Sequence, residues 1–75
     1  MYQPTDNDYV LITDKNNDCY LQVGKIVEIN YEPYDSYVNT YIIEFFDHHL
    51  KIPFRLALRG TIFEDGEAKV LNFKG

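Results

Sequence analysis

The sequence contains no tryptophan, one cysteine, four glycines and only seven basic residues against twelve acidic ones. The single cysteine, Cys19, excludes a disulfide within the chain. The scattered glycines form no phosphate-binding loop, and no apolar run approaches the roughly 18 residues of a membrane-spanning helix. The formal charge of −5 disfavours broad nucleic-acid binding and attraction to an anionic membrane. We therefore expect no membrane partner, and we do not expect nucleic acid to be the main partner.

Seventy-five residues suffice for one domain, close to the lower limit at which a core holds a fold without disulfides or metals. Apolar residues make up 45% of the chain and aromatic residues 16%, which is enough to build that core. We expect a single domain over residues 1–75, in which the polar residues 1–8 form a flexible N-terminal arm. These first residues lack the basic and apolar segments of a signal peptide, so we expect a cytoplasmic protein.

The strongest secondary-structure signal lies in residues 50–58, where large apolar residues alternate with other residues without interruption. Side chains on an extended strand point alternately to its two faces. The inward side chains are predicted to be Leu50, Ile52, Phe54, Leu56 and Leu58, with Phe54 at their centre. The outer face would carry a row of three cations, Lys51, Arg55 and Arg59. Pro53 cannot donate a ladder hydrogen bond, so it indicates an edge strand or a bend.

Other segments complete an all-β prediction. Short apolar runs bounded by turn-forming residues predict strands at residues 9–13, 20–31, 40–46, 61–64 and 67–73. Gly24 indicates a bulge or a close backbone approach, and Gly66 is predicted to adopt the left-handed conformation in a hairpin loop. No helical pattern of useful length occurs. We expect five to six short antiparallel strands closed into a small barrel, because closure removes exposed edges.

Two segments carry a resemblance to a known class of fold. Val23-Gly24-Lys25-Ile26-Val27-Glu28-Ile29 and Tyr41-Ile42-Ile43-Glu44-Phe45-Phe46-Asp47 resemble the strand pattern of SH3-like small barrels of bacterial and plastid origin, such as ferredoxin-docking subunits and KOW-type barrels. The resemblance covers residues 9–59 and implies a small SH3-like barrel that serves as a non-enzymatic docking module. The paired tryptophans of signalling SH3 domains and the basic loops of ribosomal KOW domains are missing, so recognition of proline-rich peptides is not implied.

The loop after the second predicted strand is rich in tyrosine. Tyr34 and Tyr37 stand there beside two acids, Glu32 and Asp35. Tyrosine is enriched at interfaces because it offers rigid apolar area with a polar tip, and the acids would attract a basic partner segment. The alternative is that these rings fold back to cover one end of the barrel.

Charge is segregated along the chain. Every charged residue within residues 26–47 is acidic, and every one within residues 48–63, before Glu64, is basic. One interpretation is that the third and fourth strands pair and that their charges neutralise each other across the sheet. The other is that the molecule has one acidic and one basic face. The basic face would then hold Lys51, Arg55 and Arg59 as a second contact row.

Asp47, His48 and His49 form the one cluster that suggests metal or acid–base chemistry. Adjacent histidines on a strand point to opposite faces, so both cannot easily bind one ion. Cys19 has no motif beside it that would supply a general base. We expect no catalytic residue, no metal site and no cofactor.

These observations favour a protein-interaction module without catalytic activity. Its partner would be another protein, which could carry a basic segment or be a second copy of the chain. The expected contact residues are Glu32, Tyr34, Asp35, Tyr37, Lys51, Arg55 and Arg59. Two alternatives remain: a small acidic inhibitor of phage or plasmid type that mimics nucleic-acid charge, and a weak binder of single-stranded nucleic acid that stacks bases on tyrosines.

Overall fold

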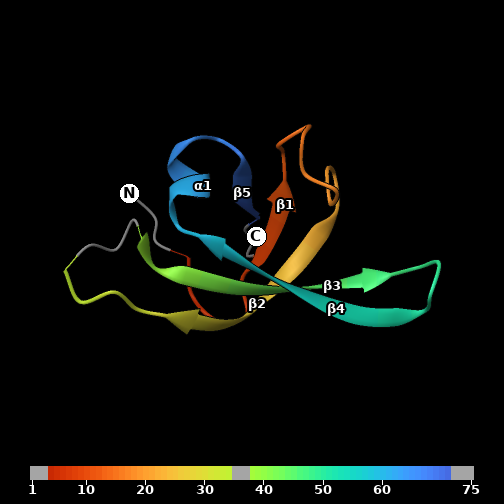
Figure 1. Cartoon of the computed structure of the whole chain (residues 1–75), viewed down its shortest axis with the longest axis horizontal. Coiled ribbons are helices and arrows are strands. Elements are labelled where there is room, and N and C mark those ends of the chain that lie inside the picture. Colours follow the sequence, from red (N-terminus) through yellow and green to blue (C-terminus); the bar gives the residue numbers. More distant parts are fainter. Residues whose placement is uncertain (1–3, 35–37, 72–75) are drawn as a thin grey trace.

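The computed structural model describes residues 4–34 and 38–71 and shows an all-β chain, which confirms the predicted fold class (Figure 1). Its elements are β1 (Tyr9–Ile12), β2 (Val23–Asn30), β3 (Thr40–Asp47), β4 (Ile52–Arg59), the short helix α1 (Thr61–Glu64) and β5 (Ala68–Leu71). The five strands form one antiparallel sheet in the order β4-β3-β2-β1-β5. No helix in the described ranges is long and apolar enough to cross a membrane.

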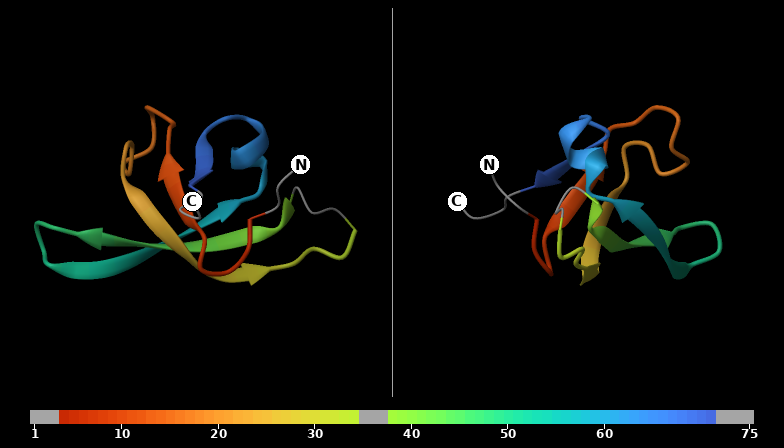
Figure 2. Two further views of the ribbon diagram at one scale, coloured as in Figure 1. Left: turned by 180° about the vertical axis from the view of Figure 1, so that it is seen from behind. Right: turned by 60° about the vertical axis from the view of Figure 1, so that its left-hand side comes forward.

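The sheet curls, but it is not closed into the expected barrel. Its two edges are β4 and β5, and the residues that the structure describes form no ladder between them. The sheet changes direction along β2, because the first residues of this strand pair with β1 and its later residues pair with β3. The β2–β3 register shifts between Ile26 and Glu28, and such a bulge increases the local twist. Figure 2 shows the result, with β1 and β5 steeply inclined to β3 and β4.

The close backbone approach predicted at Gly24 is present. A Cβ atom on Gly24 would lie 2.5 Å from Cγ2 of Ile43 and 2.7 Å from the ring of Phe45. No real Cβ contact is that short, so β2 can pass under these two side chains only because position 24 has no side chain. The bulge of this strand lies between Ile26 and Glu28 and not at Gly24.

The core is built from the inner faces of β1, β2, β3 and β5. Its largest fully buried side chains are Val10, Ile12, Ile26 and Ile43. The buried set also includes Cys19, Tyr41, Phe45 and Ala68. Phe54, Leu56 and Leu58 of β4 pack against these residues on the predicted inner face, but they are only partly buried.

The segment of residues 61–64 forms α1, and the prediction of a strand there was wrong. Ile62 and Phe63 are neighbours in sequence, and both pack against the core. A strand would send them to opposite faces, whereas one helical turn lets both face inward. The Phe63 ring meets Tyr41 edge to face, with centroids 5.2 Å apart. Gly66 has a φ of +75°, which confirms the predicted left-handed conformation.

The predicted N-terminal arm is described from Pro4 onwards. Its last residues form a turn in which Asp8 accepts a hydrogen bond from the Thr5 N–H (2.9 Å). The Asn7 N–H donates to the Ile26 carbonyl, and the Ile26 N–H donates to the Asp8 carbonyl, each at 2.9 Å. These bonds join residues 5–8 to β2.

Candidate functional site

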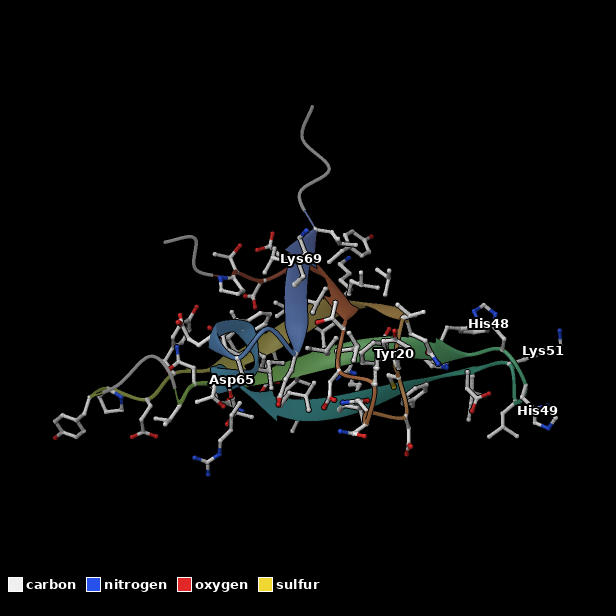
Figure 3. All side chains as sticks on the ribbon, turned by 90° about the horizontal axis from the view of Figure 1, so that it is seen from above. Tyr20, His48, His49, Lys51, Asp65 and Lys69 are labelled. Carbon is white, nitrogen blue, oxygen red and sulfur yellow. The ribbon has the colours of Figure 1, made fainter. Side chains whose placement is uncertain are left out.

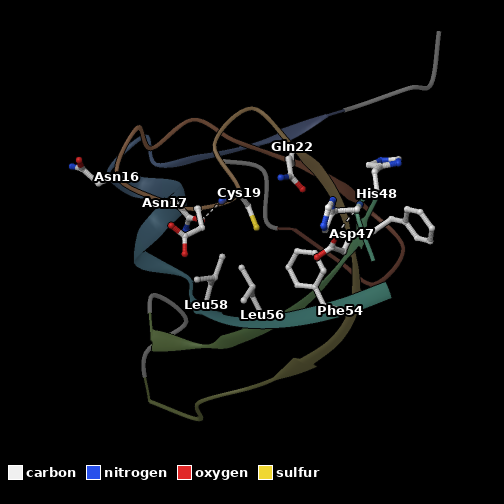
Figure 4. A pocket seen from close by; sticks show the side chains of 12 residues that line it. Asn16, Asn17, Cys19, Gln22, Asp47, His48, Phe54, Leu56 and Leu58 are labelled. Carbon is white, nitrogen blue, oxygen red and sulfur yellow. Dashed lines mark hydrogen bonds between the residues drawn. The ribbon is translucent and has the colours of Figure 1, made fainter. Parts of the chain in front are cut away.

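A groove runs along the inner face of β4, between this strand and the loop of residues 13–22 that joins β1 to β2 (Figure 4). Its volume is 720 Å³, within the range of ligand-binding clefts in proteins. Phe54, Leu56 and Leu58 form its apolar floor, and Figure 4 shows them pointing toward the loop. Across from them, Asn17 and Gln22 supply amide groups along the other wall.

The loop wall of the groove is held by short-range hydrogen bonds. The Asn16 N–H donates to the Asp14 carboxylate (2.9 Å), and the Cys19 N–H donates to the Asn17 side-chain oxygen (2.8 Å). Such Asx turns are the reason why a run of Asp and Asn favours a loop here. The Leu21 N–H donates to the Ile12 carbonyl (2.8 Å), which ties the loop back to β1.

Cys19 lies on this wall, and its Sγ atom points toward the floor of the groove (Figure 4). Burial raises the pKa of the Cys19 thiol, and the negative charge of Asp18 raises it further. The thiol therefore stays protonated at neutral pH and is a weak nucleophile.

In the turn between β3 and β4, backbone N–H groups donate hydrogen bonds to the Asp47 carboxylate. Its Oδ1 atom accepts hydrogen bonds from the N–H groups of His49 and Leu50, both at 2.9 Å. The His48 ring packs edge to face on Phe46, with centroids 5.0 Å apart. Within the described residues, no three His, Cys, Asp or Glu side chains come together in a way that could hold a metal ion.

The outer end of the β3–β4 hairpin, residues 46–53, projects at one end of the molecule, where Figure 3 labels His48, His49 and Lys51. Three of its large apolar side chains are about half exposed or more: Phe46 at 45%, Leu50 at 62% and Ile52 at 50%. The prediction that Leu50 and Ile52 face the core was wrong, because the hairpin extends past the core at this point. Alternation alone could not reveal where the core ends.

The predicted row of cations is divided by the structure. Arg55 lies opposite Glu44 in the β3–β4 register, and its Nε donates to the Glu44 carboxylate at 3.0 Å. This is the cross-sheet neutralisation that one of the two interpretations predicted. Arg59 stands opposite Thr40 at the other end of the strand. Lys51 lies in the hairpin turn with a φ of +61°, outside β4, so it does not continue the row.

The predicted tyrosine loop is described in part. The Tyr34 side chain is 95% exposed and does not cover the core. Glu32 is also exposed, and its backbone N–H donates to the Asn39 side-chain oxygen at 2.7 Å. Buried Asn39 thus fixes the start of this loop. The other two predicted contact residues, Asp35 and Tyr37, lie outside the described residues.

The structure thus separates those predicted contact residues that it describes into three places: Glu32 and Tyr34 at the start of the tyrosine loop, Lys51 in the hairpin turn, and Arg55 and Arg59 on the outer face of β4. Sequence reasoning missed the groove and the exposed apolar residues of the hairpin end, since both depend on where the curled sheet stops. No protein family, curated protein or solved structure matches this chain.

Proposed function

We propose that this chain is a non-catalytic protein-interaction module of the SH3-like small-barrel type. The observation that carries the proposal is the hairpin end, where Phe46, Leu50 and Ile52 expose apolar surface on a projecting part of the sheet. The meander of four strands, followed by α1 and by β5 beside β1, supports the barrel type that the sequence pattern suggested. A cytoplasmic location is part of this proposal.

The large apolar side chains of the hairpin end are only partly buried in the isolated chain. Burying a large aliphatic side chain fully is worth about 1.5–3 kcal/mol. Leu50 and Ile52 realise at most part of that value here, because at least half of each side chain remains exposed. A partner that covers both side chains would gain the remainder. Exposed large apolar side chains that lie close together can mark an interaction site.

The tyrosine loop is the second contact region in this proposal. Tyr34 offers an exposed aromatic side chain, and Glu32 stands near it in sequence. With Asp35 and Tyr37, this loop would suit a partner with a basic segment, as the sequence predicts. Rim acids of this kind would speed association more than they would strengthen the complex.

The observations support the two alternative functions less well. The nucleic-acid mimic needs its acids arranged along one surface, but Asp8, Asp14 and Asp47 each accept a backbone N–H within a local turn. The single-strand binder needs cations that are available to phosphates, but Glu44 already pairs with Arg55. Neither alternative uses the apolar hairpin end.

Affinity capture with a matched pair of variants tests the proposal. Ile52 in the hairpin end and Val23 at the start of β2 are β-branched strand residues of similar exposure, 50% and 47%. Proteins from the native cell extract should be retained by the wild type and by Val23→Thr, and retained several-fold less by the Leu50→Ser/Ile52→Thr variant. Equal retention by all three proteins, or retention that nuclease treatment abolishes, would contradict the proposal.

A further inference from the structure

The last strand of the hairpin, β4, leaves one side of its backbone unpaired. It pairs with β3 along its whole length, from Ile52 opposite Asp47 to Arg59 opposite Thr40. On its other side, the described part of the chain provides no neighbouring strand. An eight-residue edge of this kind is a template for pairing with another extended segment.

The register shows which backbone groups are available at that edge. Gly60, which follows β4, donates its N–H to the Asn39 carbonyl at 2.8 Å. In an antiparallel ladder, alternate residues direct both backbone groups to the same neighbour, so the even-numbered residues of β4 bond to β3. The odd-numbered residues 55, 57 and 59 therefore direct their N–H and carbonyl groups away from β3. Pro53 belongs to this outward set, where the missing N–H costs the sheet no hydrogen bond.

The groove lies along the inner face of the same strand. Its floor of Phe54, Leu56 and Leu58 is only partly buried, and residues 4–34 and 38–71 provide no sixth strand between β4 and the loop of residues 13–22. A strand added beside β4 would bring every second side chain over this floor. Apolar side chains would suit those positions.

The outer face of β4 specifies the charge of the added strand. Arg55 and Arg59 both point to this face and are exposed. Arg55 is paired with Glu44 of β3, whereas Arg59 has no acidic partner among the described residues. A second copy of β4 in this position would add two further arginines to the same face, which is unfavourable. Acidic side chains on the added strand would complement it.

We propose that the edge of β4 binds an extended segment of another protein as a sixth strand, with apolar residues over the groove and an acidic residue beside Arg59. This inference rests on the proposed interaction function, but it places the contact on the strand edge and not on the hairpin end. Main-chain hydrogen bonds supply affinity in this mode of recognition, and alternate side chains supply specificity.

The probe is a synthetic peptide of alternating valine and glutamate, of the same eight-residue length as β4. Its control peptides carry lysine in place of glutamate, or N-methyl groups that remove the N–H groups facing β4. We expect NMR amide shifts and slower hydrogen exchange at residues 55, 57 and 59 with the glutamate peptide. The two control peptides should bind at least about tenfold more weakly, because one loses charge complementarity and the other loses edge hydrogen bonds.

A matched pair of variants tests the edge from the protein side. Ala57→Pro removes the central outward N–H, and β4 already tolerates Pro53 in the same outward set. Ala57→Ser keeps the N–H. Peptide affinity should fall about tenfold or more in Ala57→Pro and stay within about twofold of wild type in Ala57→Ser. Arg59→Glu should also weaken binding, and the difference should shrink at high salt.

Several outcomes would overturn the inference. One is no binding of the glutamate peptide at concentrations up to about 1 mM. A second is peptide-induced shifts confined to Leu50 and Ile52, which would leave the proposed function intact and remove only the edge site. A third is a dimer by sedimentation whose residue-57 amide is protected without peptide, which would make a second copy the occupant. If Ala57→Pro does not fold, the N-methylated peptide decides the same question.

Discussion

β3 and β4 are paired strands of equal length, and each carries large apolar residues at every second position, on its inner face, yet these faces are buried to different depths. The inner residues of β3, Tyr41, Ile43 and Phe45, are almost fully buried. The inner residues of β4 are only partly buried. β3 has a neighbour on both sides, whereas β4 is an edge with a groove along its inner face. Alternation therefore identifies the inner face of a strand, and its position in the sheet determines how deeply that face is covered.

The same contrast continues along the hairpin. Phe54 stacks on its register partner Phe45, with ring centroids 5.6 Å apart and an interplanar angle of 23°. Beyond this pair, Phe46 and Ile52 are about half exposed. The hairpin thus has an inner part that packs in the core and an outer part that is exposed to solvent.

The comparison of β3 and β4 is tested most directly at Ile43 and Leu56, which lie opposite each other. Ile43→Ala should destabilise the protein by about 2–5 kcal/mol, because it opens a cavity in a fully buried site. Leu56→Ala should cost about half as much, since the groove already exposes part of that side chain to water. Urea denaturation gives both free energies of unfolding. Equal losses at the two positions would show that the edge strand is as well covered as its neighbour.

Gly24→Ala tests how closely β2 passes the inner face of β3. The new methyl group would overlap Ile43, and overpacking of this kind costs about 1–3 kcal/mol. Thermal unfolding would record the loss as a lower Tm. Ile43→Ala removes the closer of the two clashes, with the Phe45 ring still 2.7 Å away, so the double variant Gly24→Ala/Ile43→Ala should lose less stability than the sum of the two single losses. Full additivity would mean that the strands separate more easily than the structure indicates.

The outer faces of the two strands are joined by Glu44 and Arg55, and a double-mutant cycle with Glu44→Gln and Arg55→Gln measures their coupling. Both side chains are accessible to water, so the coupling energy should be about 0.2–1 kcal/mol. It should decrease when salt is raised to about 1 M. A coupling that salt does not change would show that the pair is screened from solvent.

The smallest effect is expected in the outer part of the hairpin. Ile52→Thr should change the free energy of unfolding by no more than about 0.5 kcal/mol, because the side chain is half exposed and the new residue keeps β-branching. Ile26→Thr is the matched control, since that side chain is fully buried and its new hydroxyl would need a hydrogen-bond partner. A loss at Ile52 similar to the loss at Ile26 would place the hairpin end in the core.

Much of the fold could be predicted from local patterns. The strands β1 to β4, the inner face of β4 at Phe54, Leu56 and Leu58, and the left-handed Gly66 follow from alternation and turn chemistry. α1 could not be predicted in this way, because its reason is tertiary: Ile62 and Phe63 both find space in the core after β4 ends. The site was predicted less completely. The exposure of Tyr34 leaves its predicted contact role a prediction, and the groove beside β4 has no signature in sequence.

The sequence by itself determined the all-β class, the inner face of β4 at Phe54, Leu56 and Leu58, and an irregularity or close backbone approach at Gly24. These depend on the two-residue period of a strand and on the conformational range of single residues. Tertiary structure alone decided that the sheet stays open, that β4 is an edge and that Leu50 and Ile52 lie beyond the core. Burial depends on what packs against a strand, and that depends on contacts between residues far apart in the chain.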